Sequence, residues 1–180
     1  MPAARESLLE AAGAALSVRP WPSVRMVDVA AAAGVSRQTL YNEFGGKAGL
    51  GRALVRREAE RYLDGVDRAL AAPARTAERL AAVAEWTVRA ARAHPLVRAL
   101  LTGGWDAGLP AAGRRTPGPG ELARAVRDRA AAALVPGEDV EQCELAVRLA
   151  LSYVVAPGEE PGTGELLRLL SARTRTAGAR

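Results

Sequence analysis

Apolar side chains recur every three to four residues along most of the chain, which is the spacing expected of helices that bury one face. The first stripe predicts a helix over about residues 3–17, and the helix-breaking residues Pro20 and Pro22 follow it. The stretch 102–120 is rich in Gly and Pro and predicts a long loop. Later stripes predict helices over about 26–33, 37–43, 47–70, 80–94, 96–101, 122–134, 140–155 and 164–173.

The composition agrees with an all-α fold. Ala, Leu, Arg and Glu dominate, and aromatic residues make up only 4% of the 180 positions, which argues against a sandwich or a barrel. Breaks at Gly45-Gly46 and Ala72-Pro73 divide the helical pattern. We therefore expect a small N-terminal three-helix domain at 1–46, a long connecting helix at 47–71 and a larger C-terminal helical domain at 72–180.

Cysteine and histidine are too few for several classes of site. The chain has one of each, Cys143 and His94, which rules out an internal disulfide and a thiolate metal cluster. No run approaches the ~20 apolar residues that cross a bilayer, and the acids Glu6 and Glu10 are untypical of a signal peptide. We therefore expect a soluble cytoplasmic protein with no metal, no cofactor and no membrane partner.

Positive charge is concentrated in one short segment. The whole chain has a net charge of +5, and residues 19–57 alone hold seven cationic and two acidic side chains, which is also a net of +5. Localised positive charge is typical of a polyanion-binding protein, because neutralising phosphates releases their condensed counterions. A solvated basic face without a partner is the alternative, and charge alone does not separate the two.

The segment from Val27 to Phe44 has the layout of a helix-turn-helix. Two short helices are predicted on either side of Gly34, which turns the chain at positive φ without steric cost. Ala30 is small enough for two helices to cross closely, and Ser36 is a typical N-cap for the second helix. The layout predicts a DNA-reading motif, and the alternative is a helical hairpin with ordinary polar faces.

The outward side chains of the second helix match the hydrogen-bonding groups of DNA. Arginine reads guanine O6 and N7, and glutamine or asparagine reads adenine N6 and N7. Lys47 opens the next helix, where its ammonium and the free backbone N–H groups both favour a phosphate. The expected DNA contacts are Ser36, Arg37, Gln38, Thr39, Tyr41, Asn42 and Lys47.

The run from Val27 to about Val55 resembles the DNA-binding domain of the TetR (tetracycline repressor) family. The pattern of a turn, two aromatic residues and a lysine appears here as Ala32-Ala33-Gly34-Val35, Tyr41, Phe44 and Lys47. One departure is Arg25, which stands where the family commonly has a threonine that caps the second helix and touches phosphate. An arginine cannot cap but can still reach a phosphate, so Arg25 joins the expected DNA contacts.

The resemblance implies a homodimer formed by the last two helices, which pack as a four-helix bundle across a two-fold axis. The residues permit this, because the helix over 140–155 is apolar on two sides and must be buried on both. A helix central to the core of one protomer is the alternative. The expected interface residues are Leu145, Leu149, Leu166, Leu167 and Leu170.

The resemblance also implies a small apolar or amphipathic effector, bound between helices of the C-terminal domain. The two tryptophans among the candidates offer flat contact area and one indole donor each. Ordinary core packing is the stronger interpretation of each single residue. The candidate lining residues are Tyr62, Trp86, Leu101, Trp105, Val126 and Cys143.

Three functions are compared on these grounds. The favoured one is a transcriptional regulator, a repressor that its effector releases from a near-palindromic DNA operator. An enzyme is disfavoured, because the sequence has no nucleophile with a paired base, no metal cluster and no phosphate-binding loop. An effector-independent DNA-binding protein, whose C-terminal domain only dimerises, remains the alternative.

Overall fold

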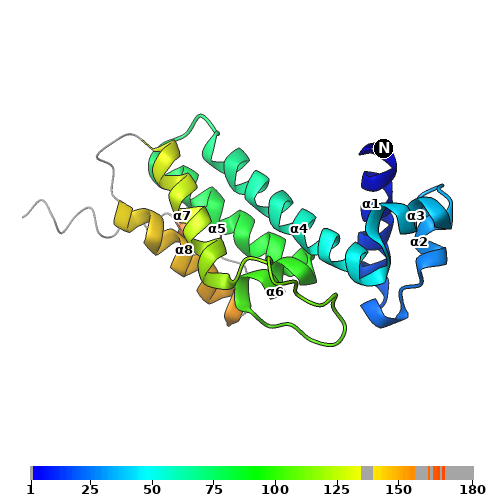
Figure 1. Cartoon of the computed structure of the whole chain (residues 1–180). Helices are drawn as coiled ribbons and strands as arrows, with labels where there is room; N and C mark the ends of the chain where they lie inside the picture. The colour runs from blue at the N-terminus through cyan, green and yellow to red at the C-terminus, as the bar shows by residue number, and fades with distance from the viewer. Residues whose placement is uncertain (1, 135–139, 157–161, 163, 167, 169–180) are drawn as a thin grey trace, which may run out of the picture. The chain divides into compact units, whose positions relative to one another are not determined.

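The computed structural model describes residues 2–134, 140–156, 162, 164–166 and 168. Every regular element within these ranges is helical, as Figure 1 shows, and none of the helices is both long and apolar enough to span a membrane. The predicted all-α class is confirmed. The elements are α1 (Pro2–Val18), η1 (Trp21–Ser23), α2 (Met26–Ala32), α3 (Arg37–Phe44), α4 (Lys47–Leu70), α5 (Thr76–Ala93), α6 (Pro95–Thr102), α7 (Pro119–Ala133) and α8 (Val140–Val155).

Two helices begin earlier than the apolar pattern predicts. α7 begins at Pro119 because a proline in the first turn needs no partner for a backbone N–H. The Glu121 carboxylate also accepts a hydrogen bond from the Gly118 N–H at 2.9 Å, which stabilises that first turn. α5 likewise begins at Thr76, before its first buried apolar residue. Polar capping residues, and not the first apolar residues, therefore determine where α5 and α7 begin.

The chain forms two compact units. Unit 1 comprises residues 1–59 and 104–116, and unit 2 comprises residues 60–103 and 117–180. α4 therefore contributes its first half to unit 1 and its second half to unit 2. The functional division at 1–46, 47–71 and 72–180 remains a prediction.

The core of unit 1 is built from one face of each of its helices. α1 packs on α2 and α3, and α2 packs on α3, as the blue and cyan ribbons of Figure 1 show. Because only the inner side of α3 takes part, its outer side stays in solvent. The apolar side chains that are at most 1% exposed in this unit are Leu8, Ala12, Val29, Ala30, Leu40, Leu50, Leu54 and Val55.

A loop from much later in the chain completes unit 1. Residues 104–116 lie between α6 and α7 in the sequence, yet they cluster with the first 59 residues. The Trp21 N–H donates to the Gly108 carbonyl oxygen at 2.7 Å. A Cβ at Gly51 would lie 3.0 Å from Pro110 Cβ and 3.2 Å from the Trp21 ring, so α4, η1 and the loop meet closely. The sequence predicts a loop here but not this attachment.

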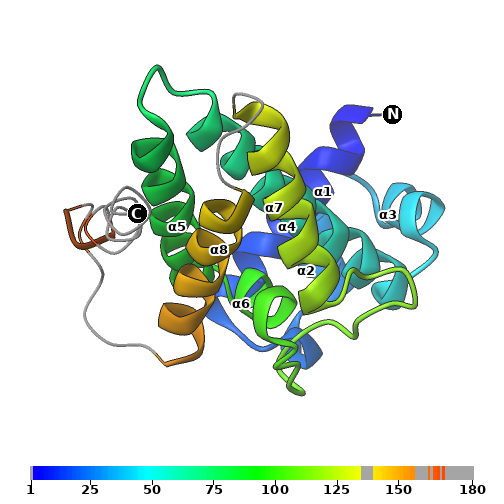
Figure 2. The same ribbon diagram turned by 90° about the vertical axis from the view of Figure 1, so that its left-hand side faces the viewer.

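Unit 2 contains the second half of α4 together with α5 to α8. α8 packs on α5, α6 and α7, and Figure 2 shows it beside α5 and α7. α4 approaches α5 closely at Gly65, where an added Cβ would lie 2.1 Å from an indole carbon of Trp86. The Trp86 Nε1–H donates to the Tyr62 carbonyl oxygen at 3.0 Å. The absence of a side chain at Gly65 therefore lets an indole lie directly on the backbone of α4.

Candidate nucleic-acid interface

One glycine fixes the turn between α2 and α3. Gly34 has a φ of 67°, a left-handed conformation that side chains with a Cβ rarely adopt. The Val35 N–H donates back to the Ala30 carbonyl oxygen at 3.0 Å, so the chain folds over the end of α2. The predicted turn is confirmed, and it sets the direction in which α3 leaves α2.

A serine caps α3, and a leucine anchors it. The Thr39 N–H donates to Ser36 Oγ at 3.0 Å, as the sequence predicts for an N-cap. Leu40 is 0% exposed and is the fully buried side chain of this helix. Gly45 ends α3 with a φ of 70°. One face of α3 is thereby held in the core, and the opposite face is left to solvent.

The solvent face of α3 carries the side chains expected to read bases. Arg37, Gln38 and Asn42 are exposed, and Tyr41 is 42% exposed. Gln38 Nε2 donates to Asn42 Oδ1 at 2.8 Å, which holds the two amides together. This bond leaves one N–H of Gln38 and both N–H groups of Asn42 for other partners. With Ser36 and Thr39, six predicted base or phosphate contacts lie on one short helix and its cap.

Arg25 and Lys47, the predicted phosphate contacts outside α3, also make internal bonds. Arg25 precedes α2 without capping it and donates twice to the Asp28 carboxylate, at 2.9 and 3.0 Å. Hydrogen bonding to Asp28 raises the pKa of Arg25 above its ordinary value. Lys47 Nζ donates to the Pro22 carbonyl oxygen at 2.8 Å and lies 5.6 Å from the Trp21 ring centre. Both cations have further N–H groups that remain available to an anion.

Charge pairing in unit 1 is uneven. Arg57 is buried and forms ion pairs with Glu6 at 3.0 Å and with Glu58 at 3.2 Å. Arg37 and Arg52 are exposed, and neither has an ion-pair or hydrogen-bond partner within the described ranges. Internal carboxylates therefore neutralise the buried cation, while these exposed guanidinium groups keep their full charge for a partner.

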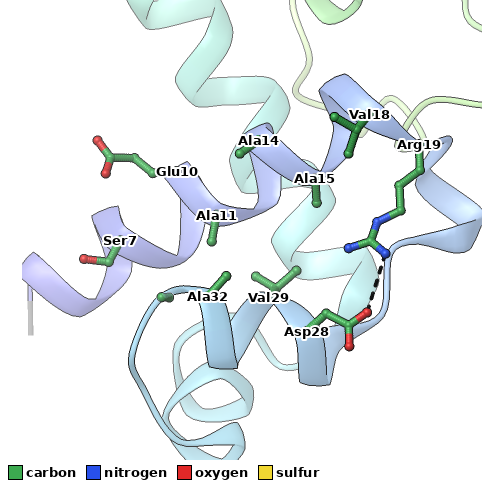
Figure 3. A pocket seen from close by; sticks show the side chains of 11 residues that line it. Ser7, Glu10, Ala11, Ala14, Ala15, Val18, Arg19, Asp28, Val29 and Ala32 are labelled. Carbon is green, nitrogen blue, oxygen red and sulfur yellow. Dashed lines mark ion pairs between the residues drawn. The ribbon is translucent and has the colours of Figure 1, made fainter.

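A groove with a volume of about 610 Å³ lies between α1 and α2 and is another surface feature of unit 1. Figure 3 shows small side chains along it, among them Ala11, Ala15 and Val29, and an ion pair of 3.7 Å between Arg19 and Asp28. Alanine and valine side chains have no hydrogen-bonding groups. Most of the groove thus lacks the donors and acceptors that base reading requires, whereas α3 presents them.

Comparison with known proteins identifies what the N-terminal part of the chain resembles. Residues 8–54 match the profile of the bacterial regulatory proteins of the tetR family. This part of the chain is similar to the DNA-binding domain of the TetR family. The HTH-type transcriptional regulator AlkX of Mycobacterium tuberculosis is 46% identical over 66 residues, which are 37% of this chain and 31% of AlkX. The chain thus spans less than a third of the length of this curated relative.

Solved TetR structures share the fold of the whole chain. The TetR family repressor AlkX from Dietzia sp. strain DQ12-45-1b has a TM-score of 0.57 and 24% identity, covering 96% of both chains. A tetR-family regulator from Streptomyces coelicolor has a TM-score of 0.60 and 23% identity, covering 99% of this chain and 86% of the other. FadR from Bacillus subtilis, solved with stearoyl-CoA, has a TM-score of 0.54 and 14% identity, covering 92% of this chain and 96% of FadR. At these identities, the likeness supports the fold alone.

Five of the six candidate effector residues lie in unit 2, and Trp105 lies in unit 1. Tyr62, Leu101, Val126 and Cys143 are each at most 4% exposed, on four different helices. Their role in effector binding remains a prediction, because core packing accounts for the same burial. No group of His, Cys, Asp and Glu side chains that could hold a metal occurs in the described part of the chain.

The buried phenol of Tyr62 predicts a stability change at alkaline pH. Its hydroxyl hydrogen-bonds Thr87 Oγ1 at 2.9 Å, and burial raises the pKa of Tyr62 to about 12 from the ordinary 10.0. Because the folded chain holds this proton more tightly, the contribution to stability is complete below pH ~10 and is lost as the pH rises towards ~12. The free energy of unfolding should fall by about 1.4 kcal/mol per pH unit in this window from this group.

Denaturant unfolding at several pH values from about 9 to 11.5 measures this slope. Tyr62→Phe should remove that part of the slope, and Tyr41→Phe, which alters an exposed ring, should keep it. Equal alkaline slopes in the wild type and Tyr62→Phe would contradict the assignment.

The structure describes only some of the residues expected at the dimer interface. Leu145 and Leu149 are half-buried on α8, away from the buried stripe that includes Cys143, Ala146 and Ala150. Val155 at the end of α8 is 66% exposed. Leu166 is fully buried, whereas Leu167 and Leu170 lie outside the described residues, as does most of the predicted helix 164–173. The second apolar face of α8 is therefore incompletely covered within the described part of one chain.

Proposed function

We propose that this protein is a DNA-binding transcriptional regulator whose α3 enters the major groove. The observation that carries the proposal is the division of α3 into two faces. Leu40 anchors the inner face, and Arg37, Gln38 and Asn42 occupy the outer face with unused donors. Arginine and amide side chains are the groups that discriminate guanine and adenine edges in that groove. Ser36, Thr39, Tyr41, Lys47 and Arg25 are assigned to positioning on phosphates.

The active form is proposed to be a homodimer. Its support is the second apolar face of α8, with half-buried Leu145 and Leu149 and an exposed Val155, which a second copy would cover. A two-fold dimer presents two recognition helices about 34–36 Å apart, so its operator is near-palindromic with half-sites one helical turn apart. Such a protein acts on the chromosome and therefore in the cytoplasm.

A small apolar or amphipathic effector is proposed to release the dimer from DNA. The support is the family, together with the largely apolar interior of unit 2. FadR of this fold was solved with stearoyl-CoA, an amphipathic ligand. An effector shifts the population off DNA only by its differential affinity for the two states. A dimer whose C-terminal unit does not respond to effectors remains the second candidate.

Gel-shift titration tests the DNA-binding proposal, with DNA that flanks the protein's own gene and an unrelated duplex of equal length. Arg37→Ala and Gln38→Ala should each weaken binding to the cognate fragment by about 1–3 kcal/mol, or roughly 5- to 150-fold. Binding to the unrelated duplex should change less, because base contacts carry the sequence information. Arg89→Ala removes one exposed arginine of unit 2 and serves as the matched control.

Footprinting on the shifted fragment should then reveal two protected half-sites about 10 base pairs apart. If the wild type and both α3 variants bind the cognate fragment equally well, then Arg37 and Gln38 do not contact bases. A wild type that binds neither duplex at low salt would defeat the whole proposal.

A further inference from the structure

Three arginines of unit 1 come together from two distant parts of the chain. Arg114 and Arg115 occupy the tip of a tight turn, which the Thr116 N–H closes by donating to the Gly113 carbonyl oxygen at 2.9 Å. A second bond, from the Gly113 N–H to Thr116 Oγ1 at 2.9 Å, reinforces the turn. A Cβ at Gly113 would lie only 3.1 Å from Cδ of Arg52 on α4, so the turn rests against that side chain.

The turn belongs to a loop that is held in place on the helix-turn-helix unit. The loop is attached through the Gly108 carbonyl oxygen, which accepts from the Trp21 N–H, and through Pro110, which lies close to Gly51 on α4. The same Trp21 ring lies 5.6 Å from Lys47 Nζ at the start of α4. Trp21 therefore connects the loop, through its backbone N–H, with Lys47, which is assigned to DNA phosphate and lies over its ring. This link brings a segment outside the first 59 residues into the cationic part of unit 1.

The charges of this cluster are not balanced from within. Arg52, Arg114 and Arg115 are all exposed, and none of the three has an ion pair or a side-chain hydrogen bond to another described residue. Like charges held close together repel one another, and a polyanion removes that repulsion while releasing its own counterions. A tight turn also limits the freedom that the two arginine backbones would lose on binding.

We propose that Arg114 and Arg115, together with Arg52, form an accessory contact to the DNA backbone beyond the base-reading helix α3. The contact is made to phosphates and carries no sequence information, so it strengthens binding to all duplexes alike. The loop between α6 and α7 thereby becomes part of the DNA-binding surface. This inference rests on the proposed DNA-binding function and extends the set of residues that perform it.

Fluorescence anisotropy with two labelled duplexes of about 40 base pairs tests the proposal, one from the region flanking the gene and one of unrelated sequence. The dissociation constant is measured over a series of salt concentrations. Each phosphate contact adds about 0.9 to the slope of log affinity against log salt concentration. Arg114→Ala with Arg115→Ala should lower that slope by about 1–2 and weaken binding to both duplexes by a similar factor, about tenfold at ~0.1 M salt.

Two controls isolate the position of the charges. The double variant Arg89→Ala, Arg124→Ala removes two exposed arginines from unit 2 and causes the same loss of net charge, but it should leave the slope unchanged. Arg114→Lys with Arg115→Lys should retain most of the slope, because a lysine also neutralises a phosphate. If the salt slope falls equally in the unit 2 control, then the effect of the Arg114→Ala, Arg115→Ala variant comes from net charge alone. That result would overturn the assignment of these two arginines to a DNA contact.

Gly51→Val tests whether the loop must be docked. Its side chain would meet Pro110 and Trp21, so it should displace the loop while all three arginines remain. Provided that circular dichroism confirms a folded chain, the salt slope should fall as in the double alanine variant. A normal slope in Gly51→Val or in the double alanine variant would overturn the inference, even if Arg37→Ala still weakens cognate binding. Failure of the wild type to bind either duplex would instead defeat the proposed function itself.

Discussion

Leu40→Ala should lower the free energy of unfolding by about 3 kcal/mol and abolish DNA binding at concentrations where the wild type is saturated. Leu40 is 0% exposed and is the fully buried side chain on the inner face of α3. A helix of eight residues is not stable by itself in water, so α3 depends on this tertiary contact. Removing three carbons from the core therefore releases the helix that carries Arg37, Gln38 and Asn42.

Denaturant unfolding measures the loss of stability, and anisotropy with the cognate fragment measures DNA binding. Val18→Ala is the matched control in the same unit, because Val18 is 81% exposed and its truncation should change stability by less than about 0.5 kcal/mol. If Leu40→Ala unfolds at the wild-type denaturant concentration, then α3 is held by something other than this contact. That result would also contradict the division of α3 into a buried face and a DNA-binding face, on which the DNA-binding proposal rests.

The second large effect is expected at Gly65→Ala, which should destabilise the chain by about 2–3 kcal/mol. The new Cβ would lie 2.1 Å from an indole carbon of Trp86, a separation that side chains do not adopt, so the ring must move. Displacing the ring should also weaken the 3.0 Å hydrogen bond that Trp86 Nε1–H donates to the Tyr62 carbonyl oxygen. An alanine normally stabilises a helix relative to glycine, which makes the expected sign of this change informative.

Gly120→Ala provides the control for this experiment. Gly120 is exposed near the start of α7, and an added Cβ would meet nothing nearer than an Arg124 nitrogen at 3.8 Å. That variant should be neutral or stabilised by about 0.4–1 kcal/mol, because it reduces the entropy of the unfolded chain. A Gly65→Ala protein as stable as Gly120→Ala would show that α4 and α5 are farther apart than this packing requires.

Local features of the helix-turn-helix are readable from the sequence, because short-range chemistry determines them. Gly34 is needed where the backbone adopts positive φ, and Ser36 caps the helix that follows it within three residues. The spacing of Leu40 among polar residues likewise predicts which face of α3 is buried. Each of these depends on contacts within a few positions, so the sequence pattern and the structure agree.

Other features of the interface depend on partners that the local sequence does not identify. Arg25 is predicted as a phosphate contact, and the structure adds that Asp28 binds its guanidinium twice. Lys47 is predicted at a helix start, and the structure adds its bond to the Pro22 carbonyl oxygen. Similarly, Trp105 is grouped in the sequence with five residues of unit 2, yet it lies in unit 1.

The amino-acid sequence determined the helical class, the turn at Gly34, the polar face of α3 and the family pattern around them, since all of these arise from neighbours along the chain. Only the tertiary structure decided that residues 104–116 join the helix-turn-helix unit and that the ring of Trp86 lies on Gly65. Those contacts join residues some 20 to 90 positions apart, and flexible Gly- and Pro-rich segments give no periodic signal of where they will dock. Long-range packing, which no local pattern encodes, therefore placed Arg114 and Arg115 beside Arg52.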